Sequence, residues 1–128
     1  MIAANIRGVF VAATAAARHL PPGGKMIVIG SNTARRALVP GAAVYGMTKA
    51  AVARLVQGLA LDFAEKKIAV IDVQPSPPAD TAPKDEAHRA RLANASPEKR
   101  IADADEIARF VTYLASPRST YINGARAN

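Results

Sequence analysis

The fold is decided by the stretch Gly23-Gly24-Lys25-Met26-Ile27-Val28-Ile29-Gly30-Ser31. Its centre, Met26-Ile27-Val28-Ile29, is a short and continuous apolar run with turn-forming residues on both sides. A run of this kind predicts a strand that is buried on both faces, as in a parallel sheet. The run Ile68-Ala69-Val70-Ile71-Asp72-Val73 predicts a second strand, and Pro75, Pro77 and Pro78 then predict an irregular loop.

Two long helical patterns flank these strands. Apolar residues at helical spacing predict one helix over residues 2–19 and another from about 44 to 66, with the two strands following them in turn. Alternation of helix and strand predicts an α/β fold with a parallel sheet and right-handed crossovers.

The last third of the chain adds weaker patterns. Residues 84–100 are polar, with one short helix expected around 86–93. Asp103 and Glu106 resemble a capping box that opens a further helix, and Tyr121-Ile122-Asn123 is a candidate for the start of a third strand. Because both sheet faces are apolar, three helices are few to cover them, and we expect open edges or faces that favour association.

Composition excludes several classes of protein. The 128 residues contain no cysteine and two distant histidines, so neither disulfides nor a metal site is expected. No apolar stretch reaches the roughly 20 residues that cross a bilayer, and the N-terminus lacks the order of a signal peptide, so the expectation is a soluble cytoplasmic protein. The net charge is +7, but no basic run exceeds two residues, and nucleic acid is an unlikely partner.

Tyr45 and Lys49 carry the most informative chemistry. They lie four residues apart at the start of the long helix, which places both side chains on one face. An ammonium beside a phenol stabilises the phenolate and lowers the phenol pKa, which suits a tyrosine that moves a proton. Ser31, at the end of the preceding strand, offers a hydroxyl where ligands of parallel sheets bind. A pair of this spacing is also common on ordinary helix surfaces, so its placement after a buried strand is what favours catalysis.

Several motifs follow one another along the chain in a fixed order. They are Asn5-Ile6-Arg7-Gly8-Val9-Phe10, the stretch 23–31, Tyr45-Gly46-Met47-Thr48-Lys49-Ala50-Ala51, the stretch 68–75, Asp105-Glu106-Ile107-Ala108 and Tyr113-Leu114-Ala115-Ser116-Pro117. Together they resemble the short-chain dehydrogenase/reductase family, with the closest similarity to its 3-oxoacyl-acyl-carrier-protein reductase-like members. The resemblance runs from about residue 2 to 125 and implies a partial Rossmann-like, doubly wound parallel sheet.

The resemblance assigns roles to single residues. It implies that Tyr45 is the general acid/base, that Lys49 tunes the phenol and binds the nicotinamide ribose, and that Ser31 orients the substrate oxygen. Asn5 would help to hold the active-site helix and a water of the proton relay; without the resemblance it reads as a locally satisfied helix residue. The loop from Ser31 to Tyr45 is one residue longer than usual, which loops tolerate.

Cofactor contacts are expected around Pro75 and Thr81, together with Tyr45 and Lys49. The sequence differs from the family pattern at two positions in this loop. Ser76 stands where the family usually has a glycine after the proline, and Thr81 lies one residue further along the chain than the family's threonine. Glycine permits a close backbone approach to a cofactor, so Ser76 changes the nicotinamide side of the site. Thr81 is equally well interpreted as a plain loop threonine.

The glycine-rich, dinucleotide-binding half that the resemblance implies has no counterpart in residues 1–128. We therefore expect one partial domain, 1–128, lacking that first half. Two functions stay open. One is NAD- or NADP-dependent hydride transfer on a small carbonyl or alcohol substrate, with little activity from this chain alone. The other is an inactive fragment that associates with itself or with an intact relative through the helices over 2–19 and 44–66.

Overall fold

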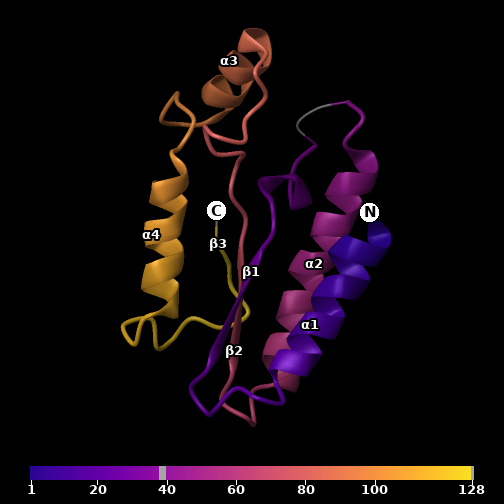
Figure 1. Ribbon diagram of the computed structural model, residues 1–128, viewed down its shortest axis with the longest axis vertical. Helices are drawn as coiled ribbons and strands as arrows, with labels where there is room; N and C mark the ends of the chain where they lie inside the picture. Colours follow the sequence, from indigo (N-terminus) through magenta and orange to yellow (C-terminus); the bar gives the residue numbers. More distant parts are fainter. Residues whose placement is uncertain (38–39, 128) are drawn as a thin grey trace.

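The computed structural model describes residues 1–37 and 40–127 and shows an α/β fold (Figure 1). These residues form a π-helical segment, a short 3-10 helix, three parallel strands and four α-helices. In chain order these are η1 (Ala3–Gly8), α1 (Val9–Ala16), β1 (Lys25–Ile29), η2 (Asn32–Ala34), α2 (Ala43–Asp62), β2 (Ala69–Val73), α3 (Glu86–Ala95), α4 (Ala104–Ala115) and β3 (Arg126–Ala127). The predicted alternation of helix and strand is confirmed.

The sheet has the order β1-β2-β3, and its strands are parallel. Lys25 pairs with Ala69 and Ile29 with Val73, so β1 and β2 end together. The third strand is short and begins at Arg126, so the expectation that it starts within 121–123 is wrong. The residues before β3 bond to Val70 of β2 in a way that is not strand pairing. The Asn123 side-chain oxygen accepts the Val70 N–H at 2.8 Å, and the Gly124 N–H donates to the Val70 carbonyl at 2.9 Å.

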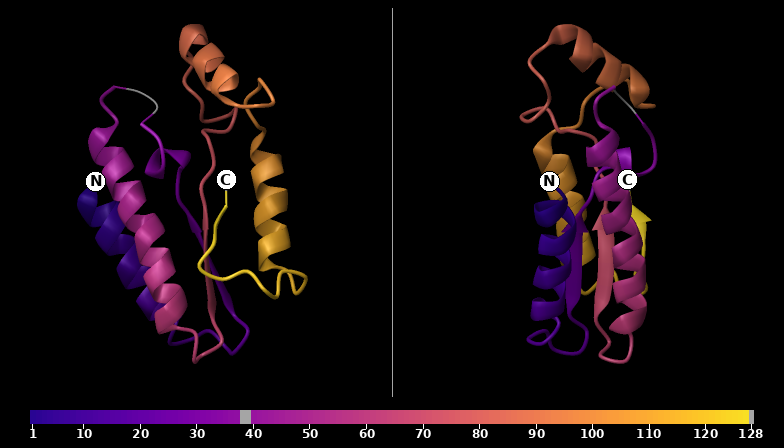
Figure 2. Two further views of the ribbon diagram at one scale, coloured as in Figure 1. Left: turned by 180° about the vertical axis from the view of Figure 1, so that it is seen from behind. Right: turned by 90° about the vertical axis from the view of Figure 1, so that its right-hand side faces the viewer.

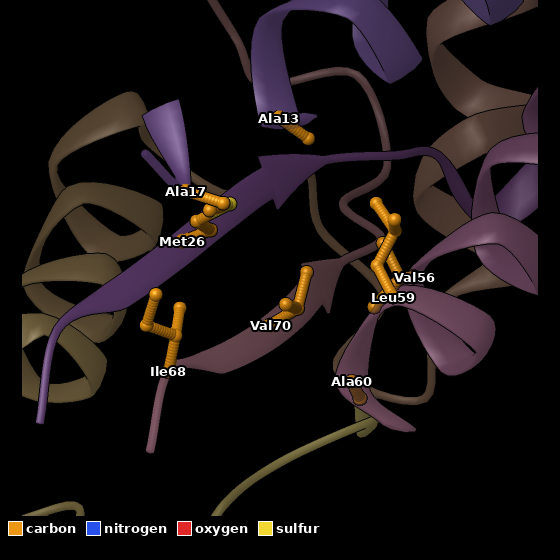
Figure 3. Packing of buried hydrophobic residues seen from close by; sticks show 8 residues of the cluster. All are labelled: Ala13, Ala17, Met26, Val56, Leu59, Ala60, Ile68 and Val70. Carbon is orange, nitrogen blue, oxygen red and sulfur yellow. The ribbon is translucent and has the colours of Figure 1, made fainter. Parts of the chain in front are cut away.

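The helices lie in layers on both faces of the sheet, with α1 and α2 on one side and α4 on the other (Figures 1 and 2). The first face holds the larger apolar core, in which Ala13 of α1, Ala17 just after that helix, and Val56 and Leu59 of α2 pack on the sheet (Figure 3). On the second face Leu114 of α4 packs on Ile71 and Val73. The alternation of side chains along β2 explains the split, because successive residues of a strand point to opposite faces.

Both faces are thus covered in part, and large apolar side chains stay exposed on α1, on α2 and at the end of β1. Ile29, the last residue of β1, is 50% exposed. β1 is also an edge strand, since only β2 pairs with it among the described residues. No helix in the described part of the chain has the length and apolar character that a membrane crossing requires.

The two long helices differ from prediction at their ends. Residues 3–8 form a π-helix rather than α-helix, and the regular helix of this segment ends at Ala16. The second helix ends at Asp62 instead of reaching 66. Lys67 has a left-handed φ of 57°, and its carbonyl accepts the Gly23 N–H, so this turn is used to bring β2 beside β1.

Candidate functional site

The carboxyl ends of β1 and β2 meet at the edge where the candidate residues were expected. Gly30 N donates to Val73 O at 2.7 Å, and Asn32 N donates to Pro75 O at 3.2 Å, which ties the two strand exits together. A pocket of about 420 Å³ opens above this edge, and α3 lies at the same end of the molecule (Figure 1). Its lining includes Ser31, Tyr45, Pro75, Ser76, Thr81, His88 and Leu92.

Tyr45 and Lys49 stand on the first two turns of α2, and both are half-buried. The Lys49 Nζ lies 5.8 Å from the centroid of the Tyr45 ring, within the range of a cation–π contact. Lys49 also donates to the Ile29 carbonyl at 3.0 Å, at the last residue of β1. Lys49 does not line the pocket itself, so it approaches Tyr45 from the side of the sheet.

Ser31 caps the short helix η2 and is almost fully buried where the pocket begins. Its Oγ accepts hydrogen bonds from Thr33 Oγ1 at 2.9 Å and from Thr33 N at 3.3 Å. Ser31 also lines the pocket, and its hydroxyl keeps a hydrogen that it can donate.

Asn5 reaches α2 from the π-helical segment. Its Nδ2 donates to Thr48 Oγ1 at 3.1 Å, and Thr48 Oγ1 donates to the Tyr45 carbonyl at 2.8 Å. Thr48 is fully buried, so the two bonds join η1 to the turn that carries Tyr45. Asn5 itself does not line the pocket.

The loop after β2 forms the opposite wall of the pocket. Pro75, Pro77 and Pro78 present a rigid apolar surface, and Ser76 Oγ accepts a hydrogen bond from Asn32 Nδ2 at 2.7 Å. Thr81 lines the pocket but is exposed, and its hydroxyl donates to the Pro78 carbonyl at 3.4 Å. The structure therefore brings four expected residues to one pocket, namely Ser31, Tyr45, Pro75 and Thr81, with Lys49 and Asn5 behind them.

The sequence reasoning missed Asp72 near the end of β2 and Gln74 directly after that strand. Both side chains are completely buried, and Gln74 Nε2 donates to Asp72 Oδ2 at 2.7 Å. Burial raises the pKa of Asp72 above its ordinary value, against the lowering effects of the Gln74 hydrogen bond and the Lys49 charge. An acid inside an otherwise apolar strand pattern was the signal that could have singled out Asp72.

Three buried side-chain oxygens in the described ranges have no hydrogen-bond partner, and all three belong to this sheet edge: Asn32 Oδ1, Asp72 Oδ1 and Gln74 Oε1. Buried acceptors without a donor are rare in folded proteins and gather at sites of function. Within residues 1–37 and 40–127 no group of three His, Cys, Asp or Glu residues lies close enough to hold a metal ion.

Known proteins match this chain over nearly its whole length. The family model described as Enoyl-(Acyl carrier protein) reductase matches residues 1–127. The cyclic-di-GMP-binding biofilm dispersal mediator protein of Escherichia coli (strain K12) is 35% identical over 122 residues, which cover 94% of this chain and 52% of that protein.

Solved structures give the same result. A short-chain dehydrogenase/reductase from Serratia marcescens BCRC 10948 superposes with a TM-score of 0.92 at 42% identity, over 99% of this chain and 52% of that one. A short-chain dehydrogenase from Burkholderia cenocepacia J2315 in complex with NADP gives 0.90 at 35% identity, over 96% and 51%. The chain thus spans about half the length of these relatives, and it belongs to the short-chain dehydrogenase/reductase family.

Proposed function

We propose that this chain is the acid/base half of an NAD(P)H-dependent oxidoreductase that interconverts a small carbonyl compound and its alcohol. The supporting observation is that the Ser31 hydroxyl and the Tyr45 phenol line one pocket, with the Lys49 ammonium beside the phenol ring. Ser31 donates to the substrate oxygen, and Tyr45 gives that oxygen its proton during reduction. Lys49 favours the phenolate that is left behind, and Asn5 holds the Tyr45 turn through Thr48.

The pocket fits the reactive end of a nicotinamide cofactor. Its volume of about 420 Å³ and its wall of prolines accept a flat ring next to a small substrate. Tyr45, Lys49, Pro75 and Thr81 would hold this end of the cofactor, which supplies or accepts the hydride. The described residues contain no glycine-rich turn for the pyrophosphate, so the rest of the cofactor must bind to the half that the longer relatives contain.

A chimera tests the proposal. This chain replaces the matching half of the Serratia marcescens relative, and consumption of NADPH and NADH is measured with a panel of ketones and aldehydes. We expect turnover by the chimera and little by the isolated chain. Tyr45→Phe should lower kcat about a hundredfold or more, because the phenol proton is lost while the ring remains. Tyr113→Phe, on exposed α4, is the matched control and should leave kcat unchanged. A folded chimera with no turnover, or turnover that survives Tyr45→Phe, rejects the proposal.

A second candidate function is association through α1 and α2. Large apolar side chains on these neighbouring helices are about half exposed: Phe10, Val11, Val44 and Met47. Apolar surface of this kind marks sites of protein contact. This function does not need catalysis, and the two candidates are separated by measuring turnover and self-association on the same chain.

A further inference from the structure

A second pocket adjoins the first one at the carboxyl edge of the sheet. Its volume is about 480 Å³, and its walls come from the two strand exits and from α3. The two pockets have five residues of their walls in common, namely Asn32, Pro75, Ser76, His88 and Leu92. Because these walls are shared, a substrate whose carbonyl lies at Ser31 and Tyr45 can extend its other end into the second pocket.

The charged side chains around the second pocket are mostly basic. Arg36 follows η2 and Arg91 stands on α3, so two segments far apart in the sequence each bring an arginine to its wall. Within residues 1–37 and 40–127, neither guanidinium has a hydrogen bond or an ion pair. Among the described residues of the wall, Glu98 is the only acid, and its carboxylate accepts a hydrogen bond from the Ser96 hydroxyl at 2.8 Å. Two arginines against one acid leave the second pocket with a positive charge that attracts anions.

Two buried amides make the second pocket polar where it meets the sheet. Asn32 is 6% exposed and Gln74 is 0% exposed, and both side chains belong to its wall. In each amide the oxygen has no hydrogen-bond partner among the residues that the structure describes. An apolar occupant would seal these oxygens off without a donor, which is costly, whereas a polar and hydrated group would not. The amides therefore favour a polar ligand, and the arginines give that ligand a negative charge.

We propose that the substrate is a carbonyl compound with an anionic group, a carboxylate or a phosphate, and that Arg36 and Arg91 bind this group in the second pocket. Guanidinium groups recognise both anions through paired, charge-assisted hydrogen bonds. The substrate class rests on the proposed function, whereas the binding of the anion does not. Neither arginine lines the pocket of Ser31 and Tyr45, so the two arginines select the substrate and take no part in the proton transfer.

The first experiment measures binding to the isolated chain, without turnover. Three compounds with the same carbonyl end are titrated: levulinate, 3-oxobutyl phosphate and the neutral methyl ester of levulinate. The side-chain amide signals of Asn32 and Gln74 are followed by NMR, because both amides lie in the wall of the second pocket. We expect at least one anion to shift these signals at a concentration about tenfold or more below that of the ester. The tighter of the two anions identifies the group. An ester that acts as readily as both anions, or signals that none of the three compounds moves, overturns the proposal.

Single charge substitutions then assign the binding to the second pocket. Arg36→Gln and Arg91→Gln should each weaken anion binding about tenfold or more, because each removes a charge-assisted pair. Arg18→Gln, in the exposed turn after α1, is the matched control and should have no effect. Glu98→Gln should strengthen anion binding about threefold, because it removes the acid from the wall. A general disturbance of the fold would not produce this gain. Arginine variants that bind the anion as Arg18→Gln does overturn the proposal.

The chimera tests whether anion binding selects the substrate. Its kcat/KM for the better anion should exceed that for the methyl ester about tenfold or more, and Arg36→Gln or Arg91→Gln should bring it down toward the value for the ester through a higher KM. An active chimera that reduces the ester as readily as the anions overturns the proposed substrate class. An inactive chimera rejects the proposed function instead, and the binding titrations then decide the anion site alone.

Discussion

Lys25 shows how one side chain can join two layers of this fold. It begins β1, and its ammonium donates to the carbonyls of Leu114, Ser116 and Ser119 at 3.1, 2.6 and 2.9 Å and to Ser119 Oγ at 2.6 Å. These carbonyls lie in the last turn of α4 and in the residues just after it, where a positive charge is favourable and carbonyls need donors.

Lys25→Met should therefore destabilise the chain by about 1–3 kcal/mol, because it removes the charged donor from a set of part-buried carbonyls. Urea denaturation monitored by circular dichroism measures the loss. Lys66→Met, which removes an exposed ammonium with no such contacts, serves as control. Equal midpoints for the two variants would show that Lys25 does not tie α4 to the sheet.

Asp72 makes a second prediction at the residue scale. Its pKa in the folded chain is raised above the ordinary value of 3.8, so the folded state holds the proton more tightly than the unfolded state does. The contribution of Asp72 to the free energy of unfolding is therefore at its maximum below pH 3.8. It falls as the pH rises through the raised pKa of the folded chain. Asp72→Asn, which carries no charge, should gain stability relative to the parent as pH rises from acid to neutral. Urea midpoints across this range check it, and a difference between the two chains that is constant with pH contradicts it.

At the scale of elements, α4 begins with the capping box that Asp103 and Glu106 predict. The Glu106 carboxylate accepts the Asp103 N–H at 3.0 Å. It also accepts hydrogen bonds from Nη1 and Nη2 of Arg100, at 2.6 and 2.7 Å. The Arg100 hydrogen bond and then the Asp103 N–H lower the pKa of Glu106 to about 2.

Because the pKa of Glu106 is lowered, its effect on stability changes with pH in the opposite direction to that of Asp72. The contribution of Glu106 to stability is present above its ordinary value of 4.5 and is lost as pH falls toward about 2. Glu106→Gln should lower the melting temperature at neutral pH, but only slightly, because the ion pair with Arg100 is exposed. Near pH 2 the substitution should have no effect, because Glu106 is then losing its charge. Glu65→Gln, in the exposed turn after α2, is the control. The same loss at both pH values would mean that the charge of Glu106 is irrelevant.

Elements whose signals are local could be predicted from sequence, and those set by distant contacts could not. The apolar runs of β1 and β2 and the capping box of α4 need only neighbouring residues. The late start of β3 depends on Asn123 bonding to Val70, far away in the chain. The site divides in the same way: the spacing of Tyr45 and Lys49 is visible in the sequence, whereas the closeness of Asp72 to Gly30 appears only when β1 and β2 pair.

At the scale of the whole molecule, the described residues include an unpaired strand edge and exposed apolar side chains on two helices. β1 is an edge strand with Ile29 half exposed, and the outward side chains of α1 and α2 include Phe10 and Met47 at 47% and 51% exposure. This chain spans about half the length of its relatives, and α1 and α2 lie on the sheet face away from α4 (Figure 2).

We expect the isolated chain to self-associate, and the helices rather than the edge to be the main surface. The double variant Phe10→Glu with Met47→Glu should shift the chain toward monomer in analytical ultracentrifugation, because charges in a contact of apolar side chains must be desolvated. Its melting temperature should change little, since both side chains are already half exposed. Phe110→Glu, on exposed α4 of the opposite face, should leave association intact. If Phe110→Glu dissociates the chain equally, or if the parent is already a monomer that melts cooperatively, contact through α1 and α2 is rejected, and the oxidoreductase is the function that remains to be tested.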